Sequence, residues 1–285
     1  MSWQILIGIS VVTFSFSTII QRIILKKAAV SPIIFTIVFQ VIVGLLILVF
    51  GIVSAAEMDI KPNLGGLALN LALSPLLYSV ANVLLAKSLA KTEASKFTII
   101  FSTRVIFTIA VAAMFLNEPL TTRQLLGTLL VLGSIILVNL KGRKLSFEKS
   151  DLMALLSAVA FGLGNVNDRY ILRFANIYPY LVFDFIAPSL ILTLFYFRHL
   201  PQVKVFLEVK LASRFLLLCS IYAVSATTFL SALKYGENVS QISVVNLTSV
   251  IITVFLALIL LKETANWTRK SAGAVLCFIG LVLVI

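Results

Sequence analysis

The sequence predicts an all-α integral membrane protein whose ten transmembrane helices form two inverted five-helix repeats. Three observations lead to this prediction: the composition is apolar, ten segments have the length of a membrane span, and the two halves of the chain resemble each other. Of the 285 residues, 60% are hydrophobic and only 12% are charged, and the mean hydropathy is +1.10. A soluble domain contains about 25% charged residues, so the composition excludes an ordinary water-soluble protein.

Ten segments are apolar over close to the ~20 residues that a helix needs to cross ~30 Å of hydrocarbon. Five of them contain no Asp, Glu, Lys or Arg: 3–21, 28–56, 62–86, 215–233 and 239–261. The other five are 97–116, 124–140, 152–167, 174–197 and 271–285. Helices are expected in all ten, because backbone groups in lipid must form their hydrogen bonds within their own segment.

The two halves of the chain carry the same order of five apolar segments. Residues 14–26 (FSFSTIIQRIILK) align with residues 161–173 (FGLGNVNDRYILR) at a constant offset of 147. At the same offset Pro32 aligns with Pro179. At an offset of 144, Tyr78 aligns with Tyr222 and Glu93 with Glu237, and Glu118 is paired with Glu263 after a shift of one residue. Because five is an odd number, the halves must enter the membrane with opposite orientations, and transporters built in this way bind their substrate between the halves near mid-membrane. We expect a first repeat over 1–140, a basic connection over 141–150 and a second repeat over 151–285.

The net charge of +12 is distributed as a topology signal rather than as a surface for nucleic acid. The connections after spans one, three, five, seven and nine hold 17 of the Lys and Arg residues, and the other connections hold five. Basic residues accumulate on the cytoplasmic side of membrane proteins. The odd-numbered connections are therefore predicted to lie in the cytoplasm and both termini outside.

Two stretches near the ends of the halves share a pattern. They read FLNEPLTTRQLLGTLLVLGSIILV (115–138) and LLKETANWTRKSAGAVLCFIGLVLV (260–284), each with a Glu that closes a span, a polar turn and a Gly-containing last span. The chain resembles the EamA-like repeat of the drug/metabolite transporter superfamily, which usually occurs twice in a chain of about this length. The family often has a proline ahead of that Glu, where this chain has Thr103 and Thr248, so no proline kink is expected in spans four and nine.

The resemblance implies ten helices, with a central cavity lined mainly by helices 1, 3, 4, 6, 8 and 9 and with helices 5 and 10 at the periphery. It also implies transport of small metabolites, often export, in the plasma membrane of a prokaryote. Polar residues inside the spans are the candidate site, because polar groups at membrane depth are costly and face the bundle interior or a wet cavity. The predicted substrate-binding residues are Arg104, Asn82, Tyr78, Asn165, Asn246, Ser249 and Ser243. For the hydroxyl-bearing residues, helix packing and bonds to their own backbone are the alternative.

Arg104 is the most informative single residue. It lies eight residues after Lys96, roughly 12 Å into its span at 1.5 Å per residue, where a charge costs at least ~2.5 kcal/mol. Its planar guanidinium can capture a carboxylate or phosphate, and the alternative is a structural ion pair with a carboxylate of the protein.

Four acidic residues receive separate interpretations. Asp168 continues the polar stripe of span six and is the candidate group for coupling to a proton or cation. Asp184 lies in a helix that the family makes peripheral, so a structural role is expected. Glu118 and Glu263 lie at span ends, where hydrogen-bonded structural roles are expected.

Three classes of function fit a membrane protein of this kind. The first is a secondary transporter of a small polar or amphipathic metabolite, such as an amino acid or organic acid, that works by alternating access. The second is a flippase for a lipid-linked carrier on the same fold. The third, a membrane-embedded lipid-modifying enzyme, needs clustered metal-binding carboxylates that the sequence lacks. No cofactor or metal is expected, and small residues such as Gly127 and Gly273 in the final helices predict a monomer or a homodimer joined through them.

Overall fold

The computed structural model describes residues 2–27, 30–54, 56, 67–116, 122–141, 144–145, 147–236 and 239–284. Helices account for nearly all of these residues, as the sequence predicts. In chain order the elements are α1 (Trp3–Lys27), α2 (Pro32–Val53), α3 (Ala68–Lys91), α4 (Ala94–Phe101), α5 (Arg104–Leu116), α6 (Thr122–Asn139), β1 (Leu140–Lys141), β2 (Lys144–Leu145), α7 (Lys149–Ile171), α8 (Ile177–Phe195), the 3₁₀ helix η2 (Phe197–Leu207), α9 (Val209–Tyr235), α10 (Val239–Asn246), α11 (Thr248–Leu260) and α12 (Trp267–Val284). The two strands form a short antiparallel pair where the expected first repeat meets the basic connection.

Six helices in the described part of the chain are long and apolar enough to cross a membrane. They are Trp3–Lys26, Pro32–Val53, Ala68–Lys91, Ala94–Val111, Ile177–Phe195 and Val209–Tyr235. The predicted number of ten spans is not confirmed by helix length and composition, because none of these six helices covers the fifth, sixth, ninth or tenth predicted span. The ninth is divided between α10 and α11, and α7, in the sixth, carries polar residues such as Asn165 and Asp168. The apolar helices are those of a multi-pass integral membrane protein.

The fourth and ninth predicted spans are both interrupted, although neither contains proline. α4 ends at Phe101 and α5 begins at Arg104, and α10 is separated from α11 by Leu247. At both interruptions a threonine hydroxyl donates to the carbonyl three residues earlier: Thr103 Oγ1 to Ile100 O at 2.8 Å, and Thr248 Oγ1 to Val245 O at 2.8 Å. Such hydroxyl bonds compete with the helical backbone pattern. As expected, neither interruption is a proline kink, and a threonine lies at or beside each one.

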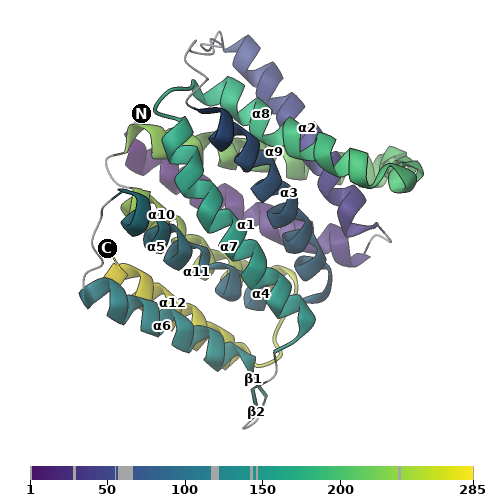
Figure 1. Ribbon diagram of the computed structural model, residues 1–285. Helices are drawn as coiled ribbons and strands as arrows, with labels where there is room; N and C mark the ends of the chain where they lie inside the picture. Colours follow the sequence, from purple (N-terminus) through teal and green to yellow (C-terminus); the bar gives the residue numbers. More distant parts are fainter. Residues whose placement is uncertain are drawn as a thin grey trace.

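The helices pack in pairs that join the two halves of the chain. α1 packs against α9 and α3 against α7, while α2 contacts α8 and α6 contacts α12. Figure 1 shows α6 and α12 side by side at one edge of the bundle and α2 with α8 on the opposite side. A Cβ on Gly280 would lie 2.7 Å from the carbonyl oxygen of Gly127, so small residues let α6 and α12 approach closely within one chain.

Hydrogen bonds between helices recur at aligned positions of the two halves. Ser10 Oγ donates to Ser225 O at 3.1 Å between α1 and α9, and Ser157 Oγ donates to Ala81 O at 2.8 Å between α7 and α3. Ser157 is the counterpart of Ser10 at the offset of 147, and Ser225 is the counterpart of Ala81 at the offset of 144. The two bonds therefore occupy equivalent positions in the two halves. In the same way, Arg22 Nη1 donates to Leu89 O at 2.5 Å, and Arg169 Nη1 donates to Leu233 O.

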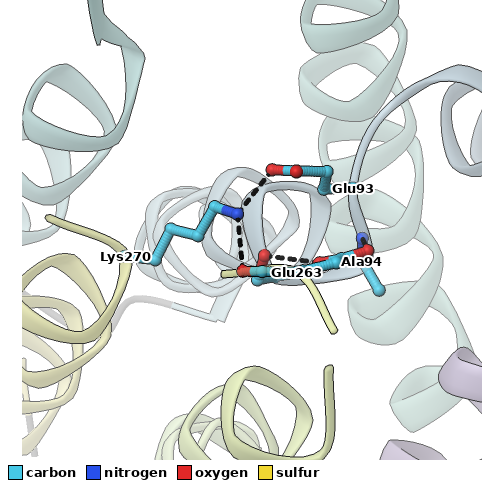
Figure 2. A network of polar contacts seen from close by, with 5 residues as sticks. Glu93, Ala94, Glu263 and Lys270 are labelled. Carbon is cyan, nitrogen blue, oxygen red and sulfur yellow. Dashed lines mark hydrogen bonds and ion pairs between the residues drawn. The ribbon is translucent and has the colours of Figure 1, made fainter. Parts of the chain in front are cut away.

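A polar network ties the two halves together at one end of the bundle (Figure 2). Glu263, in the turn before α12, accepts hydrogen bonds from the first backbone amides of α4, Ala94 N at 2.9 Å and Ser95 N at 3.1 Å. Lys270 forms an ion pair with Glu93 at 2.6 Å and donates to Glu263 O at 3.1 Å. The hydrogen-bonded structural role expected for Glu263 fits this geometry, and Glu118 lies outside the described residues.

The same end contains a second tie between the halves. Lys96 of α4 forms an ion pair with Asp151 of α7 at 2.7 Å, and Ser88 Oγ donates to Ser150 O at 2.8 Å. These contacts bring the connections after α3, after β2 and after α11 to one end of the bundle. All three are among the connections that the distribution of basic residues assigns to the cytoplasm.

A cysteine at Phe147, an exposed residue just before α7, tests this orientation. In intact cells the Phe147→Cys variant is expected to resist a membrane-impermeant thiol reagent, because the distribution of basic residues predicts that this end faces the cytoplasm. After permeabilisation the labelling should become complete. Ready labelling of intact cells would show that the basic end faces outward and that the predicted orientation is wrong.

Candidate functional site

A cavity of about 80 Å³ lies between the two halves. Its walls come from α1, α3, α5, α7, α8, α9 and α10, so both halves contribute. It is lined by Ser10, Phe14, Tyr78, Asn82, Arg104, Phe161, Asn165, Asp168, Leu181, Asp184, Phe185, Tyr222, Ser225, Ala226, Phe229, Leu230 and Asn246. The cavity is large enough for water or for part of a small ligand, and polar side chains in its lining can form hydrogen bonds with either one.

The structure brings most of the predicted binding residues together. Tyr78, Asn82, Arg104, Asn165 and Asn246 line the cavity, as does the predicted coupling residue Asp168. Ser243 and Ser249 are buried but do not belong to its lining. Ser249 accepts a hydrogen bond from Ser15 of α1 through its carbonyl oxygen at 3.2 Å, which is a contact of helix packing.

The Arg104 guanidinium is buried against aromatic rings. Arg104 is the first residue of α5, directly after the interruption, and is 6% exposed. Its Cζ atom lies 4.4 Å from the ring centre of Phe101 and 5.0 Å from that of Phe14. Each contact is a cation–π interaction, which partly replaces the hydration that the charge loses. Among the residues that the structure describes, no group forms a hydrogen bond or an ion pair with this guanidinium, so its donors remain available to a ligand.

Two carboxylates lie in another part of the cavity wall. Asp168 accepts hydrogen bonds from Tyr78 Oη at 2.5 Å and Tyr180 Oη at 2.6 Å. Asp184 Oδ1 accepts one from Ser74 Oγ, and Ser74 Oγ lies 3.4 Å from Tyr180 Oη. The hydroxyl groups therefore connect both carboxylates in one network. Asp184 has a hydrogen-bonding partner in Ser74, as a structural role requires, but it lies in the cavity lining and not at the periphery of the bundle.

Two rows of contacting aromatic rings lead from the arginine toward the carboxylates. In one row Phe101 contacts Phe161 at 5.2 Å between ring centres, and Phe161 contacts Tyr78 at 5.4 Å. In the other, Phe14 lies 6.4 Å from Tyr222, and Tyr222 lies 6.0 Å from Phe185, the residue after Asp184. The cavity lining thus combines one cation, two carboxylates and aromatic rings.

Sequence reasoning missed several of the lining residues. Phe14, Phe161 and Tyr222 are lining residues that were not proposed, although the repeat aligns Phe14 with Phe161 and Tyr222 with the proposed Tyr78. Tyr180 and Asp184 are four residues apart, so they share a face of α8, and this spacing was the available signal. Within the described residues, His, Cys, Asp and Glu do not gather in a group of three that could hold a metal ion.

The comparisons with known proteins agree with this architecture. The model of the EamA-like transporter family matches residues 1–140 and 148–285. The chain belongs to the EamA-like transporter family. This EamA-like protein is therefore a membrane transporter of the drug/metabolite type, with two copies of the family repeat.

A solved structure titled only "Crystal structure of protein" is similar to the EamA-like chain, with 14% sequence identity and a TM-score of 0.69. The alignment covers 99% of this chain and 95% of the other. At this identity the similarity shows a shared fold. No curated protein matches the sequence.

Proposed function

We propose that this EamA-like protein is a secondary transporter that exports a small polar or amphipathic metabolite, of the amino acid or organic acid type, by alternating access. The observation that carries the proposal is Arg104, a buried charge that lines the central cavity and whose guanidinium has no hydrogen-bond or ion-pair partner among the described residues. An unpaired charge at membrane depth is costly and marks substrate pathways. Its planar donor fork fits a carboxylate or a phosphate.

The proposed architecture has ten spans in two inverted repeats. The interrupted pairs α4–α5 and α10–α11 would be the fourth and ninth spans. Helix α1 of the first half packs against α9 of the second, and α3 of the first half packs against α7 of the second. These pairings and the hydrogen bonds at aligned positions support a two-fold relation between the halves. Such halves can rock about a site between them. The contact of α6 with α12 within the chain supports a monomer, and a prokaryotic plasma membrane is the proposed location.

Alternating access requires that the ties at the basic end break when the cavity opens there. Replacing Glu263, which is 9% exposed, with glutamine removes the charge that holds the first amides of α4. Weakening a buried charged hydrogen bond costs roughly 1.5–3 kcal/mol, which is enough to shift an equilibrium between two conformations. We expect the Glu263→Gln variant to make a cysteine at Ala226, in the cavity lining, at least several-fold more reactive from the basic end.

The reaction of the Ala226→Cys protein with an impermeant thiol reagent in oriented vesicles measures this effect. Glu208→Gln, which changes an exposed carboxylate at the start of α9, is the matched control and should leave the rate unchanged. An unchanged rate in the Glu263 variant would show that this network does not close the basic end.

A thermal-shift screen of the purified EamA-like protein tests the proposed class of ligand. A ligand that binds only the folded protein stabilises it by about 2.7 kcal/mol at one hundred times its Kd. We expect stabilisation by carboxylate- or phosphate-bearing metabolites and its loss in the Arg104→Ala variant. If no such metabolite stabilises the parent, the proposed function is wrong.

A further inference from the structure

We propose that the 3₁₀ helix η2 and the first turns of α9 bind the headgroups of anionic phospholipids. The proposed site, named the η2 surface, consists of the four basic side chains Arg198, Lys204, Lys210 and Arg214. All four are exposed, and none of them lines the cavity between the two halves. The inference therefore concerns a second ligand and goes beyond the proposed transport function.

The position of η2 between two long helices places it at a membrane surface. α8 ends at Phe195 and α9 begins at Val209, and both helices are long and apolar enough to cross a membrane. A segment that joins two such helices lies where the hydrocarbon ends and the headgroups begin. Phe206 holds η2 there, because its ring centre lies 4.5 Å from that of Phe215 of α9, and the Phe215 ring lies 5.3 Å from that of Phe35 of α2.

The helix η2 has an apolar face toward the bundle and a basic face beside it. A 3₁₀ helix has three residues per turn, so side chains three positions apart lie on one face. The next face after the apolar one carries Arg198 and Lys204, and at the start of α9 Lys210 and Arg214 are four residues apart and also share a face. The apolar face consists of Phe197, Leu200, Val203 and Phe206, of which the last two belong to the hydrophobic core or pack against it.

The four charges of the η2 surface are available to a ligand. In the described part of the chain none of these side chains forms a hydrogen bond or an ion pair. An amphipathic segment with basic residues on its polar face lies in the membrane interface and is attracted to anionic lipids.

Exposed apolar side chains lie next to the basic ones and distinguish a lipid from a free anion. Phe197, Leu207 and Val209 are 59%, 77% and 82% exposed. A phospholipid can cover such groups with its acyl chains while its phosphate contacts the charges. Inorganic phosphate would leave the apolar groups uncovered, so the combination indicates a phospholipid.

The basic charge of this connection is not a requirement of the fold. Residues 196–214 contain four basic residues and one acidic residue, which gives a formal charge of +3 with the histidine neutral. The equivalent connection of the first half, residues 54–67, contains one basic and two acidic residues, which gives a formal charge of −1. In the proposed inverted repeat these connections lie at opposite surfaces, and the basic one lies at the predicted cytoplasmic surface, whose leaflet carries anionic lipids. The sign of the charge therefore matches the proposed ligand.

Quenching of a single tryptophan in nanodiscs measures which lipid lies beside the η2 surface. A tryptophan replaces Leu207, and the native Trp3 and Trp267 are replaced by phenylalanine. The nanodiscs consist of phosphatidylcholine with a small share of brominated phosphatidylglycerol, which is anionic, or of brominated phosphatidylcholine, which has no net charge. We expect quenching that corresponds to an about five-fold enrichment of phosphatidylglycerol, because basic residues near a membrane surface attract anionic lipids. The enrichment should fall in high salt, which screens exposed charges.

A variant without the charges and a matched control locate the site. The combined substitution Arg198→Gln, Lys204→Gln and Lys210→Gln should abolish the enrichment. The control removes three exposed charges elsewhere at the basic end, by Lys26→Gln, Lys91→Gln and Lys149→Gln, and should keep the enrichment.

Three results would overturn the η2 surface. The first is no enrichment in the protein that retains all its charges. The second is an equal loss in the control, which would show a diffuse attraction to the whole basic end. The third is displacement of phosphatidylglycerol by added inorganic phosphate, which would show a site for a free anion. None of these measurements needs a transported metabolite, so their failure would leave the proposed function standing.

Discussion

The Arg104→Ala variant is expected to lose binding of the ligand while the protein stays folded. Truncating one partner of a buried charged pair costs roughly 2–5 kcal/mol, so the Kd should rise at least ~30-fold. The substitution also removes two cation–π contacts, to Phe14 and Phe101, but it relieves the membrane cost of the charge. The melting temperature without ligand should therefore stay near that of the parent.

The Arg104→Lys variant separates the shape of the guanidinium from its charge. An ammonium carries the same charge but cannot form two parallel hydrogen bonds to one carboxylate. We expect intermediate binding, weaker than the parent and stronger than alanine. Melting temperature and ligand affinity, measured on the same purified samples, distinguish this role from a structural one. A large loss of melting temperature with unchanged affinity per folded molecule would mean that Arg104 supports the fold rather than the ligand.

The Asp168→Asn variant is expected to lose gradient-driven transport while it keeps expression and most of its ligand affinity. The repeat places Gln21 at the equivalent position, buried at 4% exposure, so the fold accepts a neutral amide there. An asparagine can still accept a hydrogen bond from Tyr78 or Tyr180 but cannot take up and release a proton.

Transport by the Asp168 variant is measured in proteoliposomes as movement driven by a proton or cation gradient, beside exchange of ligand without a gradient. Gradient-driven movement should fall at least ten-fold, and exchange should continue. The Glu208→Gln variant, which changes an exposed carboxylate outside the cavity lining, is the control for general damage. Undiminished gradient-driven transport would remove Asp168 from the coupling mechanism.

The sequence predicts the helical fold well, because long apolar segments leave no other way to satisfy backbone groups in lipid. It also identifies Arg104, Tyr78 and Asp168 as cavity residues, because a polar or charged side chain inside an apolar span is unfavourable in lipid and therefore faces the interior. The place of Asp184 in the cavity lining was not predicted, because the direction of its side chain depends on how α8 packs against α3, where Ser74 contacts it.

The interruptions of spans four and nine show a second limit of the sequence. Proline is the familiar signal for a break, and a threonine usually continues a helix with only a small penalty. The hydroxyls of Thr103 and Thr248 bond to nearby carbonyls at the interruptions, but Ser134 forms the same kind of bond inside the continuous helix α6, so a hydroxyl in the sequence does not predict a break. Ser243 and Ser249 share the helical face of Asn246, but only Asn246 has a side chain at the cavity wall.

The central claim, that a cavity between the halves opens alternately to the two sides, is tested most directly by a single cysteine at Ala226. The buried native Cys219 and Cys277 are replaced by serine, and an impermeant thiol reagent is applied to right-side-out and to inside-out vesicles. The account predicts that Cys at this position reacts from both sides and that a bound ligand slows both reactions. Reaction from one side alone, with or without ligand, would contradict it.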